Sequence, residues 1–147
     1  MFIGTYYYNM DDKGRVALPA KYREALSKGE VYLNQTIDKS IGVYTEEGWE
    51  AFTKKMTETM SDTTTNRKSR KIARFFLSGA NSLELDKQGR VLVPVSLREF
   101  ASLGKEVVIV GMNDHLEIWD ARKFEEVDED FDVDDIEAFL TENDIRF

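Results

Sequence analysis

Two short segments of the sequence place an arginine directly after a glycine and four residues after an aspartate. They read Asp11-Asp12-Lys13-Gly14-Arg15 and Asp86-Lys87-Gln88-Gly89-Arg90. Glycine adopts the positive φ that a tight turn needs, and an aspartate side chain accepts hydrogen bonds from backbone N–H groups that follow it. An arginine held at such a turn offers a planar fork of donors that suits a phosphate or the O6 and N7 edge of guanine. Both segments are therefore candidate loops for binding nucleic acid.

Each loop has two expected contact residues and two expected organisers. The contact residues are the arginine and a nearby lysine, namely Arg15 with Lys13 and Arg90 with Lys87. The organisers are the aspartate and the glycine, namely Asp11 with Gly14 and Asp86 with Gly89. Each carboxylate either fixes the turn through backbone N–H groups or holds the guanidinium until DNA arrives. A hairpin with a solvated basic tip is the ordinary alternative for one such segment, but its recurrence in register favours binding.

The two loops belong to an internal repeat. A shift of 75 positions aligns the chain with itself without a gap, from Gly4 on Gly79 to Glu50 on Glu125. Clustered identities of this kind indicate two copies of one module. The identical pairs include Asp11/Asp86, Gly14/Gly89, Arg15/Arg90, Val16/Val91, Pro19/Pro94, Arg23/Arg98 and Gly29/Gly104.

Each copy has the pattern of a small, strand-rich module. Alternating side chains over residues 6–10 are typical of a strand with one buried face. A second strand follows each loop, and a proline then begins a short helix that a glycine ends. The expected elements are strands over 15–18, 31–37 and 41–44 with a helix over 20–27, and strands over 90–93, 107–112 and 116–119 with a helix over 95–102.

Several repeated side chains have expected structural roles. The aromatic pairs Tyr44/Trp119 and Trp49/Phe124 are expected in the core. Arg23 and Arg98 are expected to pair locally or to pack their stems over the sheet.

A helical hairpin is expected between the two copies. Thr45 is a candidate N-cap for a helix whose apolar stripe is Trp49, Phe52, Met56 and Met60, and the polar residues 61–66 end it. A second helix over 67–77 has an apolar side and a basic side. The basic side comprises Arg67, Arg70, Lys71 and Arg74, and it either contacts phosphates, or is a solvated face, or docks the acidic end of the chain. The expected division is 4–50 and 79–124 for the modules, 51–78 for the connector and 125–147 for an acidic tail.

Charge is distributed unevenly along the chain. The net charge is −8, but residues 125–147 (the acidic tail) hold eleven acidic residues and one basic residue, so residues 1–124 have 19 Lys+Arg against 17 Asp+Glu. A disordered or loosely helical arm is expected for the acidic tail, with one apolar stripe over 133–140. Its alternating aspartates do not make an EF-hand, because Val133 and Phe139 stand where that motif needs Gly and Glu.

Composition excludes several classes of function. The chain has no cysteine and a single histidine, so it has no disulfides, no thiol nucleophile and no site that needs two imidazoles. No phosphate-binding glycine loop, nucleophile elbow or zinc-binding helix appears, so we expect a protein that is not an enzyme and that has no cofactor or metal. The first residues do not form a signal peptide and no apolar run is long enough to cross a membrane, so we expect a cytoplasmic protein without a membrane partner.

The two motifs resemble the MraZ family. The resemblance covers roughly residues 1–124 and rests on Met1-Phe2-x-Gly4, on Asp11-x-Lys13-Gly14-Arg15-x-x-x-Pro19 and on Gly79-x-x-x-Leu83-x-x-Asp86-x-x-Gly89-Arg90-x-x-x-Pro94. It implies an α+β, β-rich fold of two tandem AbrB-like modules of the double-split β-barrel type, joined by a helical hairpin. Lys87 aligns with Asp12 rather than with Lys13, so the two loops need not contribute equally.

The resemblance also implies a function. Members of the family are cytoplasmic, nucleoid-associated transcriptional regulators of the division and cell wall gene cluster. They assemble into rings that present Asp-x-x-x-Arg loops to tandem repeats in double-stranded promoter DNA, with Arg15, Arg90 and Lys13 as the contacts implied here. Two alternatives remain open: an antitoxin-like protein with the acidic tail as its binding arm, and a scaffold that acts through protein contacts alone.

Overall fold

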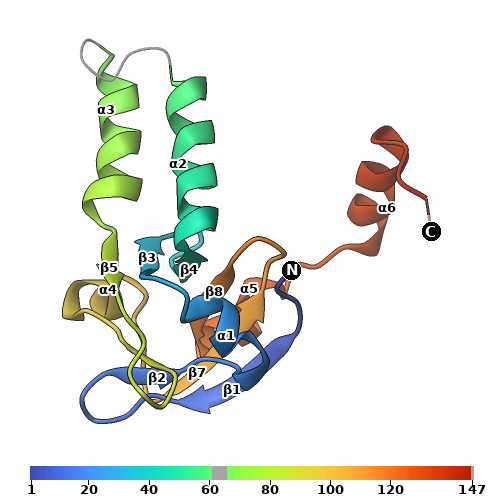
Figure 1. Ribbon diagram of the computed structural model, residues 1–147. Helices are drawn as coiled ribbons and strands as arrows, with labels where there is room; N and C mark the ends of the chain where they lie inside the picture. The colour runs from blue at the N-terminus through green and yellow to red at the C-terminus, as the bar shows by residue number, and fades with distance from the viewer. Residues whose placement is uncertain (61–65, 147) are drawn as a thin grey trace.

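The computed structural model describes residues 1–60 and 66–146 and has a mixed α+β fold (Figure 1). One sheet has six strands and a second has two. The strands are β1 (Thr5–Asn9), β2 (Arg15–Ala17), β3 (Val31–Gln35), β4 (Ile41–Thr45), β5 (Asn81–Leu83), β6 (Arg90–Leu92), β7 (Glu106–Gly111) and β8 (Leu116–Asp120). The helices are η1 (Ala20–Tyr22), α1 (Arg23–Leu26), α2 (Glu46–Thr59), α3 (Arg67–Ala73), η2 (Arg74–Ser78), α4 (Val95–Phe100), α5 (Ala121–Val127) and α6 (Val133–Glu142).

The two repeats exchange strands. The order in the large antiparallel sheet is β1-β7-β8-β4-β3-β5, so β1 of the first repeat pairs with β7 of the second, and β5 of the second pairs with β3 of the first. The equivalent strands of the two repeats are β1 and β5, β3 and β7, and β4 and β8. When each strand is replaced by its equivalent, the result is the same order read from the opposite edge of the sheet. The two copies of the sequence therefore form one interleaved body related by an approximate two-fold axis.

The strand registers locate that axis. In the two-stranded sheet, Val16 on β2 faces Val91 on β6, and these are equivalent positions of the repeat. In the large sheet, Gly42 on β4 faces Glu117 on β8, which are also equivalent. The axis therefore passes through the middle of both pairs and relates the loop before β2 to the loop before β6.

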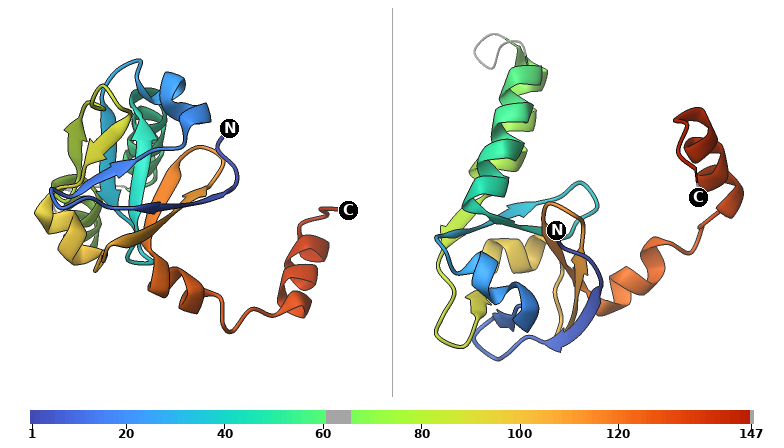
Figure 2. Two further views of the ribbon diagram at one scale, coloured as in Figure 1. Left: turned by 90° about the horizontal axis from the view of Figure 1, so that it is seen from below. Right: turned by 45° about the vertical axis from the view of Figure 1, so that its right-hand side comes forward.

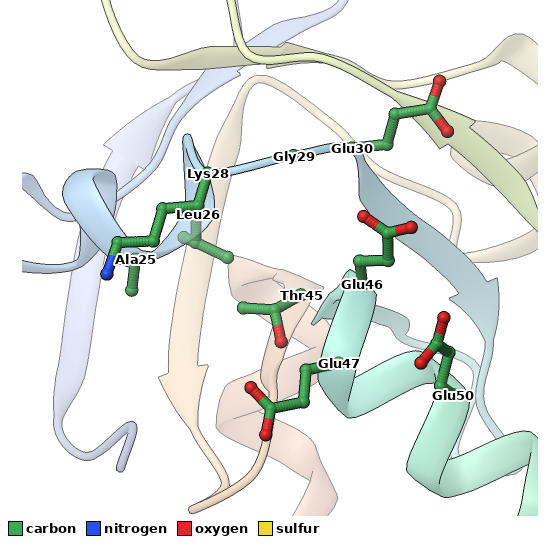
Figure 3. Close-up of a pocket in the computed structure, with 9 residues that line it drawn as sticks. All are labelled: Ala25, Leu26, Lys28, Gly29, Glu30, Thr45, Glu46, Glu47 and Glu50. Carbon is green, nitrogen blue, oxygen red and sulfur yellow. The ribbon is translucent and has the colours of Figure 1, made fainter.

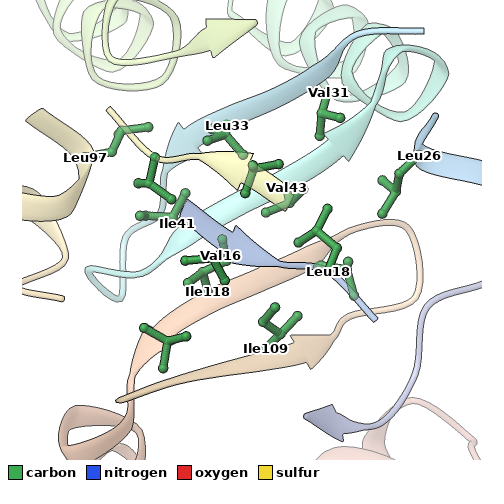
Figure 4. Packing of buried hydrophobic residues seen from close by; sticks show 14 of the residues in the cluster. Val16, Leu18, Leu26, Val31, Leu33, Ile41, Val43, Leu97, Ile109 and Ile118 are labelled. Carbon is green, nitrogen blue, oxygen red and sulfur yellow. The ribbon is translucent and has the colours of Figure 1, made fainter. Parts of the chain in front are cut away.

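Both repeats contribute to one hydrophobic core between the two sheets and the short helices (Figure 4). Val31 and Leu33 are fully buried on one face of β3, whereas Tyr32 between them is half-buried on the other face, as the period-2 alternation of a strand requires. The fully buried side chains include Val16, Leu18, Leu26, Leu33, Ile41, Val91, Leu97, Ile109 and Ile118. Because strands of both repeats bury the same core, neither repeat has a complete core of its own.

A second, aromatic cluster covers the opposite face of the large sheet. Tyr44 and Trp119 are buried there, as expected. Trp49 and Phe124 were expected in the core as well, but they are only half-buried. Each lies on a single helix that packs on the sheet from outside: Trp49 stacks on Tyr32 with ring centroids 5.6 Å apart, and Phe124 meets Trp119 at 5.9 Å.

Several helices differ from the sequence-based expectation. The helix expected over 20–27 begins as the 3-10 turn η1 and is α-helical only over α1. The helix expected over 67–77 is α-helical to Ala73 and continues as the π-helical turn η2. The helix α5 was not expected; it begins where the side chain of Asp120 accepts a hydrogen bond from the N–H of Lys123, just as Thr45 caps α2 through the N–H of Gly48.

The helical connector and the end of the chain stand apart from the sheets. The expected break at 61–66 lies outside the described residues except for Asn66, whose side chain caps α3. The hairpin of α2 and α3 projects from one side of the body, whereas α6 extends away from it on another side (Figures 1 and 2). No helix in the described part of the chain is long and apolar enough to cross a membrane. The module boundaries at 50, 78 and 124 stay a prediction.

Candidate nucleic-acid interface

The first loop is organised by Asp11. One carboxylate oxygen, Oδ1, accepts hydrogen bonds from the N–H groups of Lys13 (3.0 Å) and Arg15 (2.8 Å). The other oxygen, Oδ2, accepts from the Nε of Arg15 at 2.6 Å. The backbone of Asp11 closes the turn through the N–H of Gly14, which has a φ of +85°. Asp11 therefore both fixes the turn and holds the guanidinium, which are the two roles that the sequence left open.

The second loop repeats this geometry. Asp86 accepts from the N–H groups of Gln88 and Arg90 (both 2.9 Å) and from the Nε of Arg90 (2.7 Å). Gly89 donates to the backbone carbonyl of Asp86 and has a φ of +73°. The same five-residue pattern thus folds in the same way in both repeats, because the hydrogen bonds that form the turn and hold its arginine are local.

The two loops are also joined to each other. The N–H of Leu18 donates to the carbonyl of Gly89 at 3.1 Å, and the N–H of Val93 donates to the carbonyl of Gly14 at 2.9 Å. These bonds continue the β2–β6 pairing to both ends of the ribbon. Each loop is therefore fixed by the strand that follows the other loop.

Arg15 and Arg90 lie in one patch. The Nη1 of Arg90 is 3.6 Å from Oδ2 of Asp11, the same oxygen that Arg15 contacts at 2.6 Å. The side chain of Arg15 is 31% exposed and that of Arg90 is 27% exposed. Each guanidinium is thus held through Nε by a carboxylate while part of its surface remains open to solvent.

Two further arginines belong to this arrangement. Arg23 and Arg98 donate through Nε to the carbonyls of Leu18 and Val93, both at 3.0 Å. A Cβ at Gly14 would lie 2.7 Å from Cζ of Arg98, and one at Gly89 would lie 2.4 Å from Cδ of Arg23.

Each of these arginines therefore packs against the loop of the other repeat. The sequence assigned them only a local structural role, although their repetition at equivalent positions was a visible signal. Pairing of strands from different repeats brings them to the loops, and no local pattern indicates that pairing.

The hydrogen bonds of the loops stabilise ionised aspartates. The pKa of Asp11 is lowered to about 2, chiefly by the backbone N–H of Arg15, with the Arg15 side chain and the Lys13 N–H acting in the same direction. The pKa of Asp86 is lowered for the same reasons, first among them the N–H of Arg90. Both carboxylates are therefore charged at neutral pH. Each loop thus holds a negatively charged aspartate against its backbone N–H groups and a positively charged arginine beside it.

The patch can accept an anion from solvent. Lys13 and Lys87 are exposed and lie two residues before Arg15 and three residues before Arg90 in the sequence. A guanidinium held at Nε can still offer a terminal nitrogen to a phosphate oxygen or to a guanine edge.

Other surface features are less suited to nucleic acid. A pocket beside the start of α2 is lined by Glu30, Glu46, Glu47 and Glu50, with Lys28 at its rim (Figure 3). Four carboxylates in one pocket repel a phosphate backbone. No group of three or more His, Cys, Asp or Glu residues within 1–60 and 66–146 is arranged to hold a metal ion.

Comparison with known proteins identifies the family to which this chain is similar. The model of the family described as "MraZ protein, putative antitoxin-like" matches residues 1–71 and 76–142, so the match continues past the motifs and through α6.

Individual relatives match over most or all of their length. A protein from Finegoldia magna named transcriptional regulator MraZ is 38% identical over 147 residues, covering 99% of this chain and 100% of the relative. Proteins of the same name from Moorella thermoacetica and Clostridium tetani are 43% and 36% identical and cover 86% and 97% of this chain, and 85% and 98% of their own length. All three relatives are named as transcriptional regulators, and none is named as an enzyme. The chain belongs to the MraZ family.

Proposed function

We propose that this protein is a transcriptional regulator that binds double-stranded promoter DNA through its two Asp-x-x-x-Arg loops. Arg15 and Arg90 contact phosphates or base edges, and Lys13 and Lys87 add phosphate contacts beside them. Asp11, Gly14, Asp86 and Gly89 hold the loops in the binding conformation. The name of the relatives, transcriptional regulator, supports the regulatory part of this proposal.

One observation carries the proposal: two equivalent arginines share one carboxylate oxygen at the surface of the two-stranded β2–β6 ribbon. A side chain that is already held loses little conformational entropy on binding, which favours recognition by a fixed fork of donors. The positive φ of Gly14 and Gly89 keeps the backbone tight enough for each aspartate to reach its arginine.

Self-association completes the proposed mechanism. A single ribbon contacts few phosphates, and each phosphate contact adds only a modest, salt-dependent contribution to affinity. Linked ribbons gain through effective concentration, so a ring of copies binds tandem repeats far more tightly than one copy binds one repeat.

We further propose that the body is a double-split β-barrel of the AbrB type and that the protein acts in the cytoplasm, on the nucleoid, at the division and cell wall gene cluster. These parts of the proposal rest on the family resemblance. The strand exchange between the two repeats supports the fold assignment.

The test is fluorescence anisotropy with the promoter segment upstream of the chain's own gene at ~150 mM salt. We expect tight binding by the wild type, and loss of binding in Arg15→Ala and Arg90→Ala. Arg122→Ala, an exposed arginine on α5, is the matched control and should bind as the wild type does. A scrambled duplex reports the affinity that does not depend on sequence.

The outcomes separate the proposal from a scaffold function. Weak binding that neither loop variant changes would refute DNA reading by the loops and would favour a protein partner instead. Loss of binding in Arg122→Ala to the same degree would mean that general positive charge, and not the loops, carries affinity.

A further inference from the structure

The helix α6 has an apolar stripe that nothing in the described chain covers. Val133, Ile136, Phe139 and Leu140 lie on one side of it, and none of its residues is buried. Phe139 is 60% exposed and Val133 63%. In both figures α6 stands clear of the rest of the chain (Figures 1 and 2). An amphipathic helix is stabilised mainly by packing of its apolar face, so this stripe indicates a partner surface.

The hairpin of α2 and α3 lacks a covering element as well. No residue of α2 is buried, and α3 buries only Ser69. Apolar Met56 on α2, Met60 directly after it and Ile72 on α3 are half-buried. Near the sheet the seam between the two helices is closed by aromatic contacts such as Phe52–Phe76, but farther out no third helix of the described residues lies along it (Figure 1). A third amphipathic helix would complete the packing.

The two elements have opposite charge. Arg67, Lys68, Lys71 and Arg74 are exposed on the hairpin, and no acidic residue occurs between positions 63 and 83. The stripe of α6 is flanked by Asp135 and Glu142 on one side and by Glu137 on the other. Asp135 and Glu142 are seven residues apart, about two helical turns, and so are Arg67 and Arg74. Both the apolar and the charged parts of the surfaces are therefore complementary.

We propose that α6 of one copy packs along the α2–α3 seam of a second copy, with its acidic flank against the basic residues of α3 and against Arg74 at the start of η2. Docking within one chain is disfavoured because α6 extends away from its own hairpin and is tethered to α5 by residues 128–132, which span at most ~18 Å (Figure 2). A contact between two different surfaces, repeated head to tail, gives a ring when the rotation between copies closes, and the proposed function requires that closure. The inference rests on the self-association in the proposed function but not on DNA binding.

Cross-linking of the full-length protein tests this contact. The chain has no cysteine, so each introduced thiol is unique. Ala138→Cys on α6 and Lys68→Cys on α3, in co-expressed chains of which one has a size tag, are treated with a short bis-maleimide. We expect a covalent dimer of the two variants. As matched control, Ala138→Cys is combined with Asp38→Cys, an exposed residue in the β3–β4 turn, and should give no such dimer.

Charge exchange tests the specificity of the contact. Asp135→Lys with Glu142→Lys in the Ala138→Cys chain should lower the cross-link yield about tenfold, because attraction at each pair becomes repulsion. Arg67→Glu with Arg74→Glu in the Lys68→Cys chain should restore it. Lack of restoration would refute the charge pairing.

The remaining outcomes separate this inference from the proposed function. If light scattering shows that the wild type self-associates but no heterodimer forms, the inference alone is wrong. A cross-link that forms only within one chain of a Lys68→Cys/Ala138→Cys double variant also overturns it. A monomeric wild type would overturn both this inference and the proposed ring, while leaving DNA binding by the loops to the anisotropy experiment.

Discussion

At the scale of single residues, Asp11 links the turn to its arginine. Its two carboxylate oxygens accept hydrogen bonds from different donors. Oδ1 accepts from backbone N–H groups, and Oδ2 accepts from the guanidinium of Arg15. An amide in its place keeps one acceptor oxygen but loses the negative charge. The side chain of Asp11 is one-third exposed, so solvent screens these interactions and the ionised form contributes modestly.

The lowered pKa of Asp11 gives a prediction about acid stability. The pKa is about 2 in the folded chain and 3.8 without its partners. A depressed pKa means that the stabilising effect is complete above pH 3.8 and is lost as the pH falls toward 2. We therefore expect wild type to exceed Asp11→Asn in free energy of unfolding at pH 6, and the gap to close between about pH 4 and pH 2.

Urea unfolding of the two proteins across this pH range measures that gap. Taking the difference cancels the titration of the other acidic residues, which both proteins share. A gap that stays constant down to pH 2 would mean that the charge of Asp11 contributes nothing.

Gly14 gives a second prediction at this scale. Its φ of +85° strains any residue with a Cβ, and that Cβ would lie 2.7 Å from Cζ of Arg98. Gly14→Ala should therefore lower the free energy of unfolding by about 1–3 kcal/mol and displace Arg98. Gly104→Ala is the matched control, because its Cβ meets only a side-chain oxygen of Asp120 at 3.2 Å. Equal losses in the two variants, measured by chemical denaturation, would contradict this account.

At the scale of elements, strand exchange makes the repeats depend on each other. β1 has its partner strand β7 in the other repeat, and the same holds for β5 and β3. Unfolding of either repeat would remove partner strands from the other and expose the shared core around Val16 and Val91. Two similar sequences should consequently unfold as a single cooperative unit.

The two tryptophans allow a direct test of this cooperativity. Trp49 lies in the first repeat and Trp119 in the second. In Trp119→Phe the remaining fluorescence reports on the first repeat, in Trp49→Phe on the second, and circular dichroism reports on the whole chain in both. We expect fluorescence and circular dichroism to give the same midpoint within each variant. Two separated transitions would show that each repeat is an independent folding unit.

The parts of the structure that sequence predicted are the local ones. The Asp-x-x-Gly-Arg turns depend on hydrogen bonds within five residues, and the strands on alternation of neighbouring side chains, so both could be inferred residue by residue. Strand exchange depends on the pairing of Tyr7 with Val108 and of Tyr32 with Ser82, which no local pattern indicates. For the same reason, the contact of Arg98 with Gly14 and the sharing of Asp11 by two arginines were not foreseen.

At the scale of the whole molecule, charge is distributed unevenly between residues 1–124 and the acidic tail. Residues 1–124 carry 19 basic and 17 acidic residues, whereas the acidic tail carries eleven acidic residues and one basic. A body so close to neutral gives little affinity for DNA that is independent of sequence, since such affinity grows with the number of phosphates neutralised. In the proposed function, binding at physiological salt therefore depends on several arginine patches acting together.

This dependence predicts how affinity changes with the number of operator repeats. In the proposed ring, a duplex with one repeat should engage one ribbon, whereas a duplex of equal length with several repeats should engage several ribbons of one assembly. Effective concentration then strengthens binding by roughly 10²–10⁴-fold without any new kind of contact.

Anisotropy titrations of length-matched duplexes with one, two and three repeats measure this gain, with scrambled repeats as filler. Raising the salt should weaken the three-repeat duplex more steeply than the one-repeat duplex, because more phosphates are contacted. Equal affinity and equal salt dependence for all three duplexes would mean that one patch does all the binding. The ring would then have no part in recognition, even if it forms.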